Sequence, residues 1–158
     1  MAALDVATAL ENVRDFYAAM TSWRAICGVS TSAEAEERIY IGGTEEDVES
    51  LVPSIVLEVF ALPIENTGGH YRSPNLEVLV WCEIAVPVES CRTLEDQYLY
   101  VWQRWSLMAA ELDVLSRSDG GGMSRDMRFN QLPGRKDSKL NQGRKEWGFA
   151  FIYTTHLI

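Results

Sequence analysis

The stretch EWGFAFIYTTHLI, residues Glu146 to Ile158, decides the fold because it predicts a long, aromatic β-strand. Successive side chains of a strand point to opposite faces of a sheet. One face would carry Trp147, Phe149, Phe151, Tyr153, Thr155 and Leu157, and the other Gly148, Ala150, Ile152, Thr154, His156 and Ile158. An apolar strand of this kind needs to be covered, either by the protein's own core or by another copy of the chain.

A helix that could provide this cover is predicted from Thr93 onward. Apolar residues recur there at alternating steps of four and three, which keeps them on one helix face. The residues of this seam are Leu94, Tyr98, Val101, Trp105, Met108, Leu112 and Leu115. Thr93 and Asp96 have capping-box spacing, so we expect the helix to begin at this point. Such a seam occurs in coiled coils, but among strands it favours packing on a sheet. We therefore expect the aromatic face of the final strand to pack on the seam, and Ile152 and Ile158 to lie on a shared or exposed face.

Another helix is expected near the start of the chain, from Asp5 to Cys27. Its N-cap is either Asp5 or a capping box of Thr8 and Glu11, and Gly28 can end it in a left-handed conformation. Further strands are expected at Arg38–Gly43, Ser54–Leu62, Leu76–Val88 and, as a weaker pattern, Met127–Leu132.

Together these elements predict an α+β fold in which a mixed, mostly antiparallel sheet of about five strands is packed by two main helices. The chain length suits a single domain over residues 1–158. Two connections are longer than the fold needs: an extended hairpin loop over 63–75 and a flexible basic connection over 116–146. Long connections in compact domains are usually functional or are disordered until something binds. The hairpin loop is therefore expected to be an arm or a binding loop, with a floppy insertion as the alternative.

The formal charge of −9 is unevenly spread along the chain. Residues 1–116 hold 6 arginines and 19 acidic residues, a charge of −13, whereas residues 117–158 hold 8 basic and 4 acidic residues, a charge of +4. An acidic chain is a poor candidate for wrapping DNA, because affinity for phosphates comes from a dense basic face. The split in sign suits head-to-tail contact between unlike surfaces. Charges scattered over one solvated surface are the alternative.

Motifs for catalysis are scarce. The sequence holds no GxxxxGK followed by serine or threonine, no GxSxG and no HExxH, which are the patterns of common nucleotide-binding and hydrolytic sites. The two histidines, His70 and His156, have no serine or cysteine near them in a recognisable context. We therefore expect that the protein is not an enzyme.

No metal, cofactor or membrane is expected either. The three cysteines, Cys27, Cys82 and Cys91, lack CxxC spacing and indicate neither a disulfide framework nor a zinc site. The acidic run over 45–49 lacks the alternation and the glycine of a calcium loop, so a solvated turn is expected. No apolar run approaches the ~18 residues that a membrane span needs.

The order helix, short strand, long hairpin, long helix, weak strand and final strand resembles that of the tail terminator, or tail completion, proteins of long-tailed bacteriophages. The segments that carry the likeness are ALENVRDFYAAM, RIYIGG, VPSIVLEVFAL, NLEVLVWCEIAV, the helix from Thr93, and WGFAFIYTTHLI. They cover nearly the whole chain as a pattern of elements, without a diagnostic motif.

The resemblance implies a ring, commonly hexameric, that is seated on the last ring of the tail tube. Such a ring stops tube polymerisation and docks to the head–tail connector or head completion protein, while DNA passes through its central hole without specific binding. The family likeness implies neither catalysis nor a cofactor. The expected location is the head-proximal end of the tail in the virion, after assembly in the host cytoplasm.

Three groups of residues are expected to make subunit or tube contacts. They are His70, Tyr71 and Arg72 at the hairpin tip, Arg135, Lys136 and Lys139 in the basic connection, and Glu45, Glu46 and Asp47 in the acidic turn. Alternative functions are another head–tail adaptor or minor tail protein and, more remotely, a small enzyme of unrecognised type that uses His70. A nucleic-acid-binding module over Arg117–Lys145 is a further alternative, against which the presence of Phe129 as its one aromatic residue counts.

Overall fold

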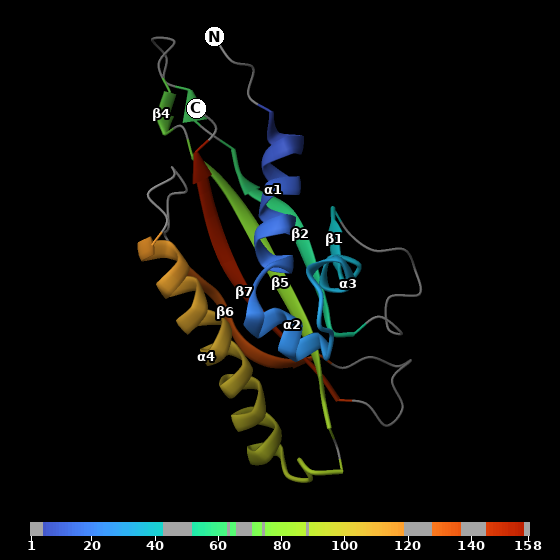
Figure 1. Cartoon of the computed structure of the whole chain (residues 1–158). Coiled ribbons are helices and arrows are strands. Elements are labelled where there is room, and N and C mark those ends of the chain that lie inside the picture. Colours follow the sequence, from blue (N-terminus) through green and yellow to red (C-terminus); the bar gives the residue numbers. More distant parts are fainter. Residues whose placement is uncertain are drawn as a thin grey trace.

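The computed structural model describes residues 5–42, 52–62, 64–65, 71–73, 75–87, 89–118, 128–136 and 145–156. Its elements, in chain order, are α1 (Val6–Ala18), α2 (Thr21–Cys27), α3 (Ser32–Glu36), β1 (Ile39–Ile41), β2 (Ser54–Ala61), β3 (Ile64–Glu65), β4 (Tyr71–Ser73), β5 (Asn75–Val86), α4 (Leu94–Ser118), β6 (Arg128–Lys136) and β7 (Lys145–His156). They form a single α+β domain in which the described helices lie over one face of the main sheet (Figure 1).

The closing strand β7 lies inside the sheet. The strand order is β1–β2–β5–β7–β6, and β3 pairs with β4 in a separate ladder within the hairpin loop. β1 and β2 are parallel, whereas the other neighbours in the main sheet are antiparallel. β1, β2, β5 and β7 therefore form a mixed, mostly antiparallel sheet, as expected, which β6 continues beyond β7. Strands of the same chain cover both edges of β7.

The helix-facing side of β7 packs on two helices. Trp105 of α4 stacks on Phe151 with ring centroids 6.1 Å apart, and Tyr98 of α4 lies 6.0 Å from Trp147. Tyr153 instead packs on two aromatic rings of α1, at 5.2 and 5.9 Å. The expected packing of the aromatic face on the long helix is thus confirmed for Phe151 and Trp147, whereas Tyr153 belongs to the contact with α1.

The opposite side of β7 is buried too, so the expectation of a shared or exposed face is wrong for Ile152, which is only 3% exposed. On the same side the indole of Trp81 lies across Gly148, where an added Cβ would be 2.5 Å from the ring. The indole N–H of Trp81 donates to the carboxylate of Glu83 at 2.9 Å. The large side chain of Trp81, from the neighbouring strand β5, lies over this side of β7 and contributes to its burial. Ile158 lies outside the described residues.

The helix expected from Asp5 to Cys27 is two helices, because Met20 takes an extended backbone with ψ of 129° between them. Asp5 caps α1 by accepting the N–H of Thr8 at 3.0 Å, which decides between the two expected caps in favour of Asp5. Gly28 ends α2 with φ of 70°, as expected for a left-handed C-cap.

Helix α4 begins where its capping residues predict, since the Thr93 hydroxyl accepts the N–H of Asp96 at 3.1 Å. The expected seam is buried at Val101, Met108 and Leu112 and partly buried at Trp105 and Leu115. Its first turn is not buried: Leu94 is 62% exposed and Tyr98 is 42% exposed. Gln97 occupies the buried position of that turn, and its side-chain amide donates to a backbone carbonyl of the preceding loop at 3.2 Å. The expected burial of the seam is therefore wrong for Leu94, whereas Tyr98 is exposed in part and still contacts Trp147 of β7.

Strand β6 is longer than the strand expected at Met127–Leu132. It spans Arg128–Lys136 and so includes Pro133 and Gly134, near which its register with β7 is irregular. The stretch 116–146, expected as a flexible connection, thus contains the end of α4, all of β6 and the beginning of β7.

Candidate functional site

The residues predicted to make contacts lie at opposite ends of the sheet where they are described. Tyr71 and Arg72 belong to β4, which leads into β5 beside the last residues of β7. Arg135 and Lys136 belong to the end of β6, in register with the first residues of β7. The structure therefore does not bring these two groups together. The other predicted contact residues lie outside the described residues: His70, Lys139, Glu45, Glu46 and Asp47.

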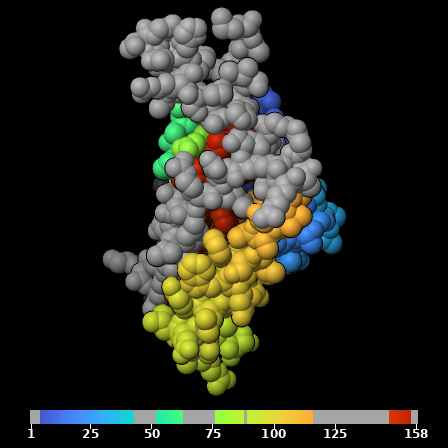
Figure 2. Space-filling model, turned by 90° about the vertical axis from the view of Figure 1, so that its left-hand side faces the viewer, coloured from blue at the N-terminus to red at the C-terminus, as the bar shows by residue number. Residues whose placement is uncertain are grey.

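A surface that the sequence analysis did not identify lies on the side of α4 that faces away from the sheet. In Figure 2, α4 lies at the surface of the molecule. Leu99, Leu107 and Val114 are exposed there, Val114 by 63%. Their spacing of eight and seven residues brings them to one side of the helix, away from the buried seam. We call these three residues and the hollow beside them the α4 surface. The spacing of these three residues is visible in the sequence, but three apolar residues are a weaker pattern than the seven of the seam on the buried side.

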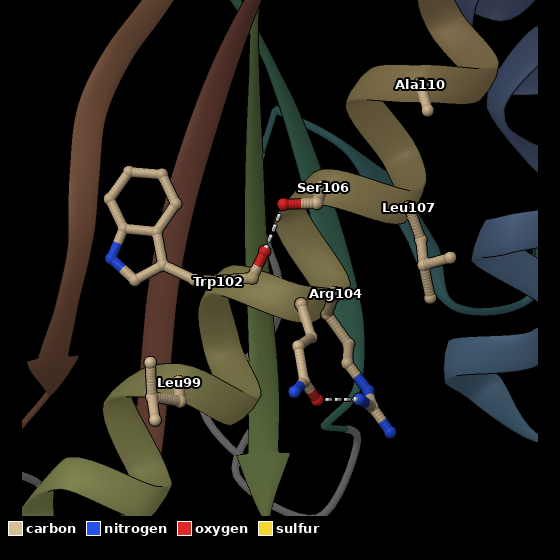
Figure 3. Close-up of a pocket in the computed structure, with 7 residues that line it drawn as sticks. Leu99, Trp102, Arg104, Ser106, Leu107 and Ala110 are labelled. Carbon is tan, nitrogen blue, oxygen red and sulfur yellow. Dashed lines mark hydrogen bonds between the residues drawn. The ribbon is translucent and has the colours of Figure 1, made fainter.

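The hollow of the α4 surface has a volume of about 520 Å³ and is shallow. It is lined by Leu99, Trp102, Gln103, Arg104, Ser106, Leu107 and Ala110, which come from successive turns of the helix (Figure 3). Its polar atoms are partly bonded within α4: the Ser106 hydroxyl donates to the Trp102 carbonyl at 2.7 Å. The Arg104 guanidinium lies 3.7 Å from the ring centre of Tyr100. What the hollow offers to a partner is therefore mainly apolar contact.

A second exposed apolar group lies at the end of β2. Val59, Phe60 and Leu62 form it, with Phe60 49% exposed and Leu62 58% exposed. The register between β2 and β5 shifts between Val59 and Ala61, so Phe60 is the extra residue of an irregular ladder. We call these three side chains the β2 surface. Two unlike apolar surfaces on one domain are suited to contacts with other protein surfaces.

The titratable groups of the described residues do not gather into a metal site: no group of three or more histidine, cysteine, aspartate or glutamate side chains is found among them. The cysteines are free. Burial raises the pKa of the Cys27 thiol to about 12 and raises that of Cys82 well above its usual range. Both thiols therefore stay protonated near neutral pH and are poor nucleophiles.

Within the described part of the chain, no helix is long and apolar enough to cross a membrane. A scan against protein-family models gives no match, and a search of the curated proteins gives none. Function therefore has to be inferred from the residues and surfaces of this chain.

Proposed function

We propose that this chain is a structural protein of a virion, a tail terminator that forms a hexameric ring at the head-proximal end of a tail tube. In this role it stops tube polymerisation and docks to the head–tail connector or head completion protein. DNA passes through the ring without specific binding. The protein is not an enzyme, and it assembles in the host cytoplasm.

The observation that carries the proposal is the pair of exposed apolar surfaces on a domain whose core is already filled. The α4 surface lies on a helix and includes a hollow, whereas the β2 surface lies at the end of a strand. Closed rings are built from heterologous contacts, in which one patch meets a different patch on the next subunit. A protomer of such a ring therefore needs two unlike surfaces, and further partners above and below the ring need others.

The order of elements gives further support. The likeness to tail terminators rests on the order helix, short strand, long hairpin, long helix, weak strand and final strand. In this chain α1, β1, the β2–β5 hairpin, α4, β6 and β7 follow one another in that order, with α2 and α3 between α1 and β1.

The proposal is tested by the molar mass in solution, measured by light scattering after size exclusion, together with negative-stain images of the same peak. We expect a ring with a central hole. If a 17.8 kDa monomer elutes instead, purified tail tubes are added and their ends are imaged. A chain that neither forms rings nor caps tubes would contradict the proposal.

Reversing the charge of Arg135 and Lys136 to glutamate is expected to weaken assembly or tube capping without changing the melting temperature of the monomer. Both residues are the last two of strand β6, and substitutions that leave the core and the backbone unchanged usually alter stability by less than about 0.5 kcal/mol. Light scattering reports assembly, and thermal unfolding followed by circular dichroism reports stability. Glu95→Lys, an exposed reversal in the first turn of α4, is the control. Assembly that is as strong as in the control would mean that the two basic residues are only solvated surface.

A further inference from the structure

The exposed apolar side chains of the described residues are concentrated in two places. Of the nine large hydrophobic side chains that are exposed there, five lie on α4 and three lie at the end of β2. The five on α4 are Leu94, Tyr98, Leu99, Leu107 and Val114. Single exposed apolar residues are normal on a protein surface, whereas groups of them mark contacts with other molecules. The α4 surface and the β2 surface are therefore the two candidate contact surfaces of the described chain.

These two surfaces do not cover each other within one copy. α4 packs on β7 through the rings of Tyr98 and Trp105, and the α4 surface lies on the side of the helix that faces away from the sheet. β2 is separated from β7 by β5, so α4 and β2 lie over different parts of the sheet (Figure 1). A contact between the two surfaces therefore joins two copies, and because the surfaces are unlike, it joins them head to tail.

The shapes of the two surfaces suit each other. The α4 surface contains the hollow of about 520 Å³. The β2 surface contains Phe60, which is 49% exposed and lies where the register between β2 and β5 is irregular. Aromatic side chains that enter pockets of the partner contribute a large share of the binding energy in protein interfaces. Phe60 is therefore the side chain of the β2 surface that we expect to fill the hollow.

The hollow of the α4 surface has a positive charge. Arg104 is among the residues that line it, and none of the lining residues is acidic. Glu111, which directly follows the hollow along the helix, already accepts the N–H groups of Thr21 and Ser22. A partner with a carboxylate near its apolar contact would therefore be favoured at this hollow.

The β2 surface has negative charges beside it. Residues 52–62 hold one charged side chain, that of Glu58, which is exposed and directly precedes Val59 and Phe60. Glu58 is paired with Leu79 of β5, and Ala61 is paired with Glu77. Residues 77 and 79 are two positions apart in a strand, so Glu58 and Glu77 lie on the same side of the sheet. The end of β2 thus combines an exposed aromatic ring with acidic residues, which is the combination that the hollow favours.

We propose that the α4 surface of one copy binds the β2 surface of a second copy of this chain, with Phe60 in the hollow and Glu58 facing Arg104. The inference rests on the proposed ring, because it names the two surfaces through which the subunits of that ring meet. In the joined state each copy covers the hollow of one neighbour and has its own hollow covered by the other.

The test is crosslinking with a short bis-maleimide in a Cys27→Ser background, since Cys82 and Cys91 are buried and Cys27 is only partly so. Glu58→Cys and Gln103→Cys, the latter in the hollow, are combined in one chain. We expect this double variant to give a ladder of crosslinked oligomers on a denaturing gel, because every copy then carries both halves of the contact. Each variant with only one of these cysteines should give monomer.

A matched control keeps the cysteine in the hollow and moves the other to a different element. Asp15→Cys on α1 is exposed and, combined with Gln103→Cys, should give no ladder. A ladder of equal strength in this control would mean that the crosslinks come from random collisions, and would overturn the contact.

The outcomes of crosslinking separate this inference from the proposed function. Rings in the images without a ladder would overturn the contact and leave the ring standing. Dimers from either variant with one introduced cysteine would also overturn it, because they require an isologous contact. A ladder together with open filaments would support the contact and contradict the closed ring. Absence of a ladder and of any assembly, with or without tail tubes, would overturn both.

A charge swap provides a second measurement that does not depend on the crosslinker. Glu58→Lys and Arg104→Glu should each reduce the assembled fraction in light scattering, because like charges then face each other across the contact. The double variant Glu58→Lys/Arg104→Glu should recover assembly, since the pair is restored with its signs exchanged. Thermal unfolding of each variant verifies that the fold is intact. A double variant that assembles no better than the single variants would contradict the proposal.

Discussion

Replacing Glu111 with alanine is expected to lower the free energy of unfolding by about 2–3 kcal/mol. The two carboxylate oxygens of Glu111, on α4, accept the N–H groups of Thr21 and Ser22 at 2.9 and 2.7 Å. These are the first amides of α2, which have no partner within the helix. A negative charge at a helix N-terminus is also favoured by the helix dipole. The substitution removes both acceptors at once.

The expected effect is large because α2 depends on its neighbours. It has 7 residues, and helices of that length are unstable by themselves in water. The residues Met20 and Trp23, just before and within α2, are almost completely buried in the core. Glu111 therefore holds in place the segment that delivers these two side chains, and its loss loosens their packing as well as the helix end.

Urea denaturation followed by tryptophan fluorescence measures the effect. Glu111→Gln should fall between wild type and Glu111→Ala, because the side-chain amide keeps one oxygen acceptor but loses the charge. Glu95→Ala removes an exposed glutamate from the first turn of the same helix and is the control, with an expected change within about 0.5 kcal/mol. If Glu111→Ala were no more destabilising than Glu95→Ala, the contact with α2 would contribute nothing to stability.

The Glu111 contact also shows why part of the fold could be predicted from the sequence and part could not. The caps at Asp5 and Thr93 and the turn at Gly28 involve residues within a few positions of each other, so a local pattern reveals them. Helix α3 begins with a capping box of Thr31 and Glu34, a local pattern of the same kind, although the sequence analysis did not predict this helix. The bonds of Glu111 join residues 89 and 90 positions apart, and no local pattern reports them.

The spacing of apolar residues predicts the wrong buried position in the first turn of α4. Leu94 and Tyr98 continue the apolar spacing of the seam, but both are exposed, and Tyr98 contacts the sheet through the ring of Trp147 without being buried by it. The interior position goes to Gln97, since its amide can reach a backbone carbonyl of the loop that turns into the helix. The buried Gln97 is thus held by one hydrogen bond of its N–H, while its side-chain oxygen has no partner among the described residues, and this arrangement depends on tertiary geometry.

Of the two candidate surfaces, one could be predicted from the sequence and the other could not. The α4 surface follows from the spacing of Leu99, Leu107 and Val114 and could have been predicted from the sequence. The β2 surface could not, because the exposure of Val59 and Phe60 depends on how far β1 pairs with β2 among the described residues and on the irregular register between β2 and β5. The sequence predicts that strands exist, whereas the edges are decided by their order.

Adding a single methyl group at Gly148 is expected to destabilise the protein, although alanine is usually favoured over glycine inside a strand. The new Cβ would lie 2.5 Å from Cζ2 and 3.0 Å from Cη2 of Trp81, closer than the ~3.5–4.0 Å at which carbon atoms pack. The indole cannot simply move away, because its N–H donates to the buried carboxylate of Glu83 at 2.9 Å. We expect Gly148→Ala to lower the free energy of unfolding by about 1–3 kcal/mol, the usual cost of overpacking.

A double-mutant cycle identifies the cause of this loss. Trp81→Leu removes the ring that lies over Gly148 and is itself destabilising, because a large apolar group is lost from the sheet. In that background Gly148→Ala should be neutral or stabilising, since the methyl group no longer meets the indole and strand preference then favours alanine. Urea denaturation of the four proteins measures the coupling. An equal cost of Gly148→Ala in both backgrounds would mean that the clash with Trp81 is not its origin, and that the backbone at residue 148 itself requires glycine.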